Sequence, residues 1–83
     1  MKPQFTYVYV LSSLSSENRH YTGMTKNLTN RLKTHNSGAV KSTSTSRPWR
    51  IETAIAFRSA KKAAEFEKYL KSHSGRAFAT KHF

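Results

Sequence analysis

Residues 5–11 read Phe-Thr-Tyr-Val-Tyr-Val-Leu and form a β-rich segment that is apolar on both faces. Successive side chains of a strand point to opposite faces of its sheet. One face therefore carries Phe5, Tyr7, Tyr9 and Leu11, and the other carries Val8 and Val10. A strand that is apolar on both faces belongs in the middle of a sheet, so we expect this segment to be a central strand.

Two further strands are predicted. The polar, serine-rich stretch 12–18 is typical of a hairpin connection, and residues 20–24 follow as the returning strand, closed by Gly23. Residues 49–57 alternate strictly between apolar and polar side chains, with residues 49, 51, 53, 55 and 57 inward. The segment 39–48, which leads into this third strand, is a basic loop rich in hydroxyl groups. Its composition suits a linker and a phosphate-contacting loop equally well.

Two helices are predicted from their caps. Asn27 can cap a helix that runs to about residue 37, where Gly38 is a natural stop. Ser59 can cap a second helix that continues to about Lys71. We expect a turn at Ser74–Gly75, followed by a short helix over residues 76–78. The fold class is therefore α+β, with a small three-stranded antiparallel sheet flanked by two to three helices.

The composition limits what the chain can be. Its 83 residues suffice for one domain with one small core, so we expect a single domain over residues 1–83. There is no cysteine, which excludes disulfides, thiolate metal sites and cysteine nucleophiles. The sequence has no apolar run of the roughly 20 residues needed to span a membrane, and Met1–Gln4 lack a signal-peptide core. We expect a cytoplasmic protein.

The charge is strongly one-sided. Fifteen Lys and Arg residues stand against four Glu and no Asp, for a formal net charge of +11. Such a balance favours a polyanionic partner, with nucleic acid first and an anionic membrane surface second. The cations are spread along the chain and form no basic tail.

Glu67 breaks the pattern of its helix. On a helical projection it lies at the centre of a stripe formed by Ala60, Ala63, Ala64 and Leu70. A carboxylate on an inward stripe is costly unless it is paired or bound to a cation. Glu67 is therefore either a structural ion-pair partner or a metal ligand.

The first helix has a similar anomaly. Its apolar stripe contains only Leu28 and Leu32, and Arg31 and His35 fall on the same face. The strand tyrosines Tyr9 and Tyr21, these two cations and Glu67 are the residues that a simple core does not explain.

In these residues the chain resembles the GIY-YIG nuclease family. Tyr7-Val8-Tyr9 stands where the first triplet belongs and Tyr21-Thr22-Gly23 where the second does, with eleven residues between Tyr9 and Tyr21. Segment 27–38 is similar to the helix that carries the family's arginine, and 46–49 to the start of its third strand. Segment 63–71 is similar to the helix with the metal-binding glutamate, and places that residue at Glu67.

The resemblance implies a metal-dependent DNA endonuclease with one Mg²⁺ or Mn²⁺ on Glu67 and no small-molecule cofactor. Four glutamates could scarcely hold two metal ions. Tyr9 is the expected general base, with Tyr21 sharing or relaying the proton, and nearby cations would favour its tyrosinate form. Arg31 would stabilise the transition state, and His35 would assist proton transfer or contact phosphate.

Other interpretations of the same residues stay open at this point. Tyr9 and Tyr21 would also be ordinary core tyrosines, and Arg31 would only extend along its helix and pair with Glu67 or Glu52. A direct Arg31–Glu67 ion pair would explain both anomalies without catalysis. The chain would then be a non-catalytic nucleic-acid-binding module that retains the fold. A third interpretation is a structural adaptor for an acidic protein.

DNA is the expected partner, whether branched, nicked or intact, in repair or processing, and a separate targeting protein is a further possible partner. The expected phosphate contacts are Lys33, Lys41, Arg47, Lys61, Lys62 and Arg76. The sequence leaves the oligomeric state open.

Overall fold

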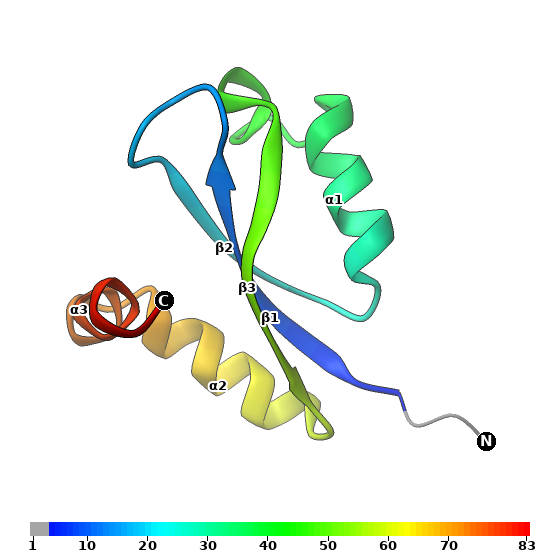
Figure 1. Cartoon of the computed structure of the whole chain (residues 1–83). Helices are drawn as coiled ribbons and strands as arrows, with labels where there is room; N and C mark the ends of the chain where they lie inside the picture. The colour runs from blue at the N-terminus through cyan, green and yellow to red at the C-terminus, as the bar shows by residue number, and fades with distance from the viewer. Residues whose placement is uncertain (1–3) are drawn as a thin grey trace.

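The computed structural model describes residues 4–83. Residues 1–3, part of the N-terminal segment in which we looked for a signal peptide, lie outside this range. Strand β1 (Thr6–Ser13) is the middle strand of a sheet of order β2-β1-β3 (Figure 1). It pairs antiparallel with β2 (His20–Thr25) and with β3 (Trp49–Phe57). The predicted central strand and the predicted α+β class with a three-stranded antiparallel sheet are confirmed.

Three helices flank the sheet. Helix α1 (Leu28–Ser37) covers one face, and α2 (Ala60–Leu70) and α3 (His73–His82) lie on the other (Figure 1). A short 3₁₀ turn, η1 (Ser44–Ser46), interrupts the loop that leads from α1 to β3. None of the helices in residues 4–83 has the length and apolar character to cross a membrane.

The helix ends are set locally, as the cap residues predicted. The Asn27 side chain accepts a hydrogen bond from the amide of Asn30, and Gly38 ends α1 in the left-handed conformation, with φ 87°. Ser59 caps α2 by accepting from the amide of Lys62. These contacts satisfy donors that the first turn of a helix otherwise leaves unpaired.

The two faces of β1 enter two separate cores. Val8 and Val10 pack with Ala63 and Leu70 of α2. Tyr9 and Leu11 pack with Trp49 on the α1 face, and Leu28 and Leu32 extend that core. The division follows from the alternation of side chains along a strand that has a helical layer on each side.

A bulge in β3 divides its inward residues between these cores. Val10 pairs with Thr53, whereas the next residue, Leu11, pairs with Ile51, so Glu52 is an extra residue in β3. Ile51 therefore lies on the α1 face and Thr53 on the α2 face. The alternation of residues 49–57 was predicted correctly, but these residues do not share one face.

Two predictions for the second half of the chain are wrong. On α2 the buried side chains are Ala63 and Leu70, while Ala60 and Ala64 are exposed. Phe66 also packs against this core. Its ring offers more apolar surface than an alanine side chain, so α2 buries Phe66 in place of Ala60 and Ala64, and Glu67 lies at the margin of the buried face.

Ser74–Gly75 is not a turn. Ser72 caps α3 by accepting from the amide of Gly75, and the helix runs ten residues from His73. Gly75 packs against the backbone of Tyr69 at the end of α2, where a Cβ atom has no room. Gly75 therefore allows α3 to pack closely against the end of α2. The position of this glycine in the sequence did not indicate such a contact.

Candidate active site

Tyr9 lies at the centre of the candidate site. Its side chain is 1% exposed, and its hydroxyl lies 3.0 Å from Nε2 of His35. Gly23 is its partner on β2, and the phenol ring lies over this glycine, where any Cβ atom would collide with the ring. The absence of a side chain at Gly23 is thus what lets the hydroxyl reach α1.

His35 joins this hydroxyl to the loop that follows α1. The imidazole is fully buried, and its Nδ1 lies 2.9 Å from the hydroxyl of Thr43. That hydroxyl donates to the carbonyl oxygen of Val40 at 3.3 Å. The indole of Trp49 donates to the carbonyl of Thr43 at 2.8 Å and holds the loop in place. A fully buried imidazole cannot contact phosphate, so this part of the prediction for His35 is wrong.

The partners assign a direction to the hydrogen bonds. A hydroxyl has one proton, and Thr43 gives it to a carbonyl, which can only accept. In this arrangement Thr43 accepts from Nδ1–H of His35. Burial, aided by the charge of Arg31, lowers the pKa of His35 below its usual 6.5, so the ring is neutral and Nε2 carries no proton. The Tyr9 hydroxyl therefore donates to Nε2.

The electrostatics of Tyr9 differ from the prediction. Burial, with smaller contributions from Tyr21 and Glu67, raises the pKa of Tyr9 from 10.0 to about 12, although Arg31 acts to lower it. Nearby cations do not maintain a tyrosinate here, because desolvation outweighs them. A Tyr9 that acts as a base must therefore pass on its own proton as it takes another.

Tyr21 stands beside this pair. Its ring centroid lies 4.8 Å from that of His35 and 6.3 Å from that of Tyr9, and the side chain is half-buried. The structure thus brings Tyr9, Tyr21 and His35 together as predicted.

The charges of Arg31 on α1 and Glu67 on α2 both act on Tyr9. Arg31 is exposed, so the prediction that it lies buried on the inward stripe is wrong, although its charge still acts on Tyr9. Arg31 acts to lower the pKa of Tyr9, and Glu67 has a small raising effect on it.

The ion pair predicted as an alternative for Arg31 does not form. Within residues 4–83, Glu67 pairs with Lys71 at 3.4 Å, and Glu52 pairs with Arg50 at 3.7 Å. Because neither carboxylate holds Arg31, its guanidinium is free of both.

The chain matches the model of the GIY-YIG catalytic domain over residues 5–81. It belongs to the GIY-YIG family. This is a family of nucleases, and the resemblance seen in the sequence is confirmed. No curated protein and no solved structure shows significant similarity to the chain.

The family's two triplets lie side by side in this GIY-YIG domain. Tyr7 and Tyr9 of the first triplet pair with Thr25 and Gly23 on β2, and Tyr21 of the second pairs with Leu11. The last residues of the two triplets, Tyr9 and Gly23, therefore pair with each other. Tyr9 provides a buried phenol on β1, and Gly23 on β2 leaves the space that this ring needs.

The residues of this GIY-YIG domain suit a hydrated metal ion better than a fully caged one. Within residues 4–83, no three His, Asp or Glu side chains lie close enough together to hold a metal ion between them. Glu67 offers one carboxylate, with a side chain 23% exposed and a lysine as its ion-pair partner. Mg²⁺ commonly keeps several waters and uses one or two carboxylates plus substrate phosphates, so a single partly exposed carboxylate fits it.

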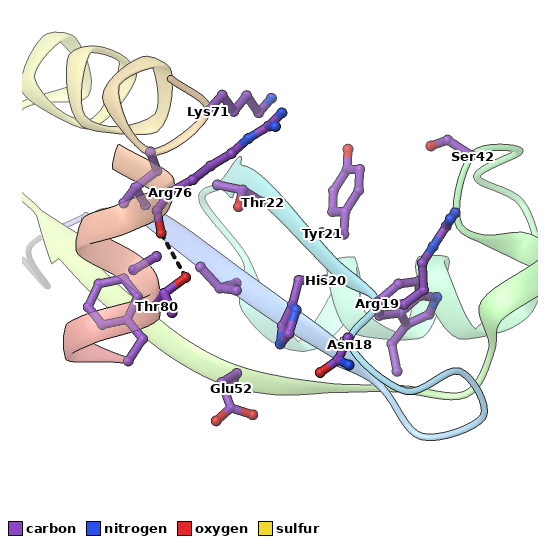
Figure 2. A pocket seen from close by; sticks show the side chains of 15 residues that line it. Asn18, Arg19, His20, Tyr21, Thr22, Ser42, Glu52, Lys71, Arg76 and Thr80 are labelled. Carbon is purple, nitrogen blue, oxygen red and sulfur yellow. Dashed lines mark hydrogen bonds between the residues drawn. The ribbon is translucent and has the colours of Figure 1, made fainter. Parts of the chain in front are cut away.

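A groove of about 930 Å³ lies against the β2 side of this GIY-YIG domain. Figure 2 shows Lys71 and Arg76 on one side of Tyr21 and Thr22, and Arg19 and Ser42 on the other. The cations lining the groove are Arg19, Lys71 and Arg76, with His20 between them. Of these, the sequence predicted Arg76 as a phosphate contact and missed Arg19 and Lys71, which have no distinguishing spacing.

The other predicted phosphate contacts lie elsewhere. Lys33 is exposed on α1, and Lys41 and Arg47 are exposed on the loop, where Arg47 donates to the carbonyl of Ser44 at 2.8 Å. Lys61 and Lys62 are exposed in the first turn of α2, roughly 15 Å along the helix from its last turn. The structure does not bring these five into the groove with Arg76.

Proposed function

We propose that the protein is a metal-dependent DNA endonuclease that hydrolyses phosphodiester bonds. The observation that carries this proposal is the buried hydrogen bond of 3.0 Å between the Tyr9 hydroxyl and Nε2 of His35, with the charges of Arg31 and Glu67 acting on the same phenol. A core tyrosine needs one acceptor, and a backbone carbonyl would suffice. A neutral, buried imidazole is instead a proton acceptor that operates near neutral pH.

The proton transfer runs along this bond. As a water molecule attacks phosphorus, its proton passes to the oxygen of Tyr9, and the phenolic proton passes to Nε2 of His35. The resulting imidazolium keeps Nδ1–H on Thr43 and donates Nε2–H back to Tyr9. Tyr9 thus stays neutral throughout, which avoids the unfavourable buried tyrosinate that its raised pKa indicates.

Arg31 supplies the charge that the transition state needs. Its guanidinium is exposed and free of Glu52 and Glu67, so it can donate two N–H groups to phosphate oxygens. Tyr21, which is half-buried and lines the groove, would hold the water or share its proton.

Glu67 would hold the divalent cation, Mg²⁺ or Mn²⁺. The ion would stabilise negative charge on the leaving 3′ oxygen. We propose no small-molecule cofactor, a role in DNA repair or processing, a cytoplasmic location, and a separate protein that supplies targeting.

A non-catalytic nucleic-acid-binding module is the second candidate. The pKa of Tyr9, raised to about 12, favours it, because a structural phenol in a core would show the same shift. In that case the groove would bind DNA, and the Tyr9–His35 bond would serve only stability.

Cleavage of supercoiled plasmid and labelled branched DNA with Mg²⁺ or Mn²⁺ tests the proposal. The variants are Glu67→Gln and, as a matched control, Glu65→Gln, an exposed acid on the same helix. We expect nicking by the wild type and by Glu65→Gln, and none by Glu67→Gln, with DNA binding retained in all three. Salt-sensitive binding without cleavage by the wild type would support the second candidate.

A further inference from the structure

Lys71 contacts both the candidate metal ligand and the groove. It follows α2 directly, and its Nζ lies 3.4 Å from Oε2 of Glu67. This is the ion pair that Glu67 makes within residues 4–83. The same lysine lines the groove, next to Arg76 (Figure 2).

The Glu67–Lys71 pair is easily opened. The lysine side chain is 52% exposed, and the residues are four apart on one helix, a geometry whose ion pairs are weak in water. An ammonium on a flexible four-carbon stem can also exchange partners without any change in the backbone.

The groove offers Lys71 a different anionic partner. Arg19, Lys71 and Arg76 line it against one carboxylate, Glu52. That carboxylate already accepts from Ser12 at 3.1 Å and pairs with Arg50. Cations on both sides of a groove of about 930 Å³ suit a chain of phosphates better than one small anion.

The groove also leads to the active site. Tyr21, whose ring lies 4.8 Å from that of His35, is part of its lining. A strand that places one phosphate beside Tyr21 can therefore set a neighbouring phosphate against Lys71 and Arg76.

We propose that Lys71 is a displaceable cation, which occupies Glu67 in the free protein and moves to a DNA phosphate in the groove when substrate binds. The proposal rests on the nuclease function proposed above, because it takes DNA as the occupant of the groove and Glu67 as the metal ligand. Lysine and the divalent cation then compete for one carboxylate.

The exchange makes metal and DNA binding mutually supportive. A phosphate that draws Lys71 away frees Glu67 for the metal ion, and a metal ion on Glu67 frees Lys71 for the phosphate. Coupling of this kind is reciprocal, so the metal must tighten DNA binding by the factor with which DNA tightens metal binding.

The first test compares Lys71→Gln with Lys68→Gln, which removes an exposed lysine from the same helix outside the groove and outside any ion pair with Glu67. Mn²⁺ binding without DNA is followed by electron paramagnetic resonance. Lys71→Gln is expected to bind Mn²⁺ about twofold more tightly than the wild type, in line with the strength of an exposed helical ion pair. Lys68→Gln is expected to match the wild type.

The second test measures binding of a short fluorescein-labelled DNA duplex by anisotropy, with EDTA and then with Mg²⁺ at equal ionic strength. All proteins carry Tyr9→Phe, which prevents cleavage. Lys71→Gln should weaken binding and reduce the slope of log affinity against log salt by about 0.9. It should also lose the gain in affinity that Mg²⁺ gives the parent protein.

Arg76→Gln separates groove charge from cation exchange. It should weaken DNA binding as Lys71→Gln does but leave Mn²⁺ binding unchanged, since Arg76 does not pair with Glu67. Lys81→Gln, on α3 outside the groove, is its control.

The proposal is overturned if Lys71→Gln behaves as Lys68→Gln in either assay, or if the Tyr9→Phe parent protein fails to bind the duplex. These outcomes are distinct from failure of the nuclease function. A wild type that does not nick DNA, with variants that bind as expected, would overturn the activity and leave the exchange standing. If the wild type nicks DNA but Lys71→Gln leaves DNA binding and Mn²⁺ binding unchanged, the exchange is overturned and the nuclease function stands.

Discussion

The hydroxyl of Tyr9 and Nε2 of His35 lie 3.0 Å apart, and the hydrogen bonds of Thr43 assign the shared proton to the tyrosine. The assignment depends on Thr43, more than 30 residues away in the chain from Tyr9, whose own proton is committed to the carbonyl of Val40. A strand, a helix and a loop therefore jointly determine which group is the donor and which is the acceptor.

Replacing Tyr9 by Phe should abolish cleavage while leaving DNA binding intact. Loss of a general base typically costs about 10²- to 10⁴-fold in rate. The variant also leaves Nε2 of His35 without a partner, so the free energy of unfolding should fall by about 1–3 kcal/mol. Urea unfolding and plasmid nicking measure the two effects, and nicking at the wild-type rate would show that Tyr9 is a structural phenol.

Thr43 should act as a positioning residue for His35. In Thr43→Val the hydroxyl is lost, Nδ1–H has no acceptor, and the proton can move to Nε2, where it blocks acceptance from Tyr9. We expect a loss of about 10²-fold in cleavage rate and a changed acid limb of the pH–rate profile.

Thr43→Ser retains the hydroxyl and should restore the rate. Heteronuclear NMR of the imidazole nitrogens reports the tautomer directly. If Thr43→Val and Thr43→Ser lose the same activity and show the same tautomer, Thr43 serves only to pack the loop.

Gly23→Ala tests the close contact of β2 with the phenol ring. A Cβ atom there would come 2.5 Å from Cζ of Tyr9, so the ring must move away. Overpacking of this kind costs about 1–3 kcal/mol of stability, and displacement of the hydroxyl should reduce cleavage by about 10²-fold. DNA binding in EDTA should be unchanged, and retention of full nicking activity would contradict the placement of Tyr9.

Stability should fall when the pH is lowered below about 6.5, the ordinary pKa of histidine. The pKa of His35 is lower in the folded protein than in the unfolded chain, so acid protonates the unfolded chain first and draws the equilibrium toward it. Its contribution to stability is complete above about pH 6.5 and declines as the pH falls toward the folded-state pKa.

Urea unfolding between about pH 7.5 and pH 5.5, on either side of the ordinary pKa of histidine, measures this slope. His35→Gln should flatten it, whereas His73→Gln, at an exposed position, should not. An unchanged slope in His35→Gln would mean that another group is responsible.

The features that the sequence predicted well are local ones. Asn27 and Ser59 satisfy amides within their own first turns, and Gly38 adopts a conformation that other residues avoid. The apolar character of β1 on both faces likewise needs no knowledge of its neighbours.

The features that it missed depend on contacts between distant segments. Periodicity gave Arg31 and His35 the same inward face, but His35 is fully buried and Arg31 is exposed. Phe66 reorients α2, and no pattern within 60–71 shows that Lys71 reaches both Glu67 and a groove formed with β2 and α3.

The burial of β1 on both faces has a further consequence. Tyr9 belongs to the α1 core, and its neighbours Val8 and Val10 belong to the other, so the strand has no solvent-facing side on which changes are harmless. Substitutions that reshape either core must shift the phenol with it. Variation that adapts this protein to new substrates is therefore expected to accumulate at the groove and the loops, while β1 changes slowly.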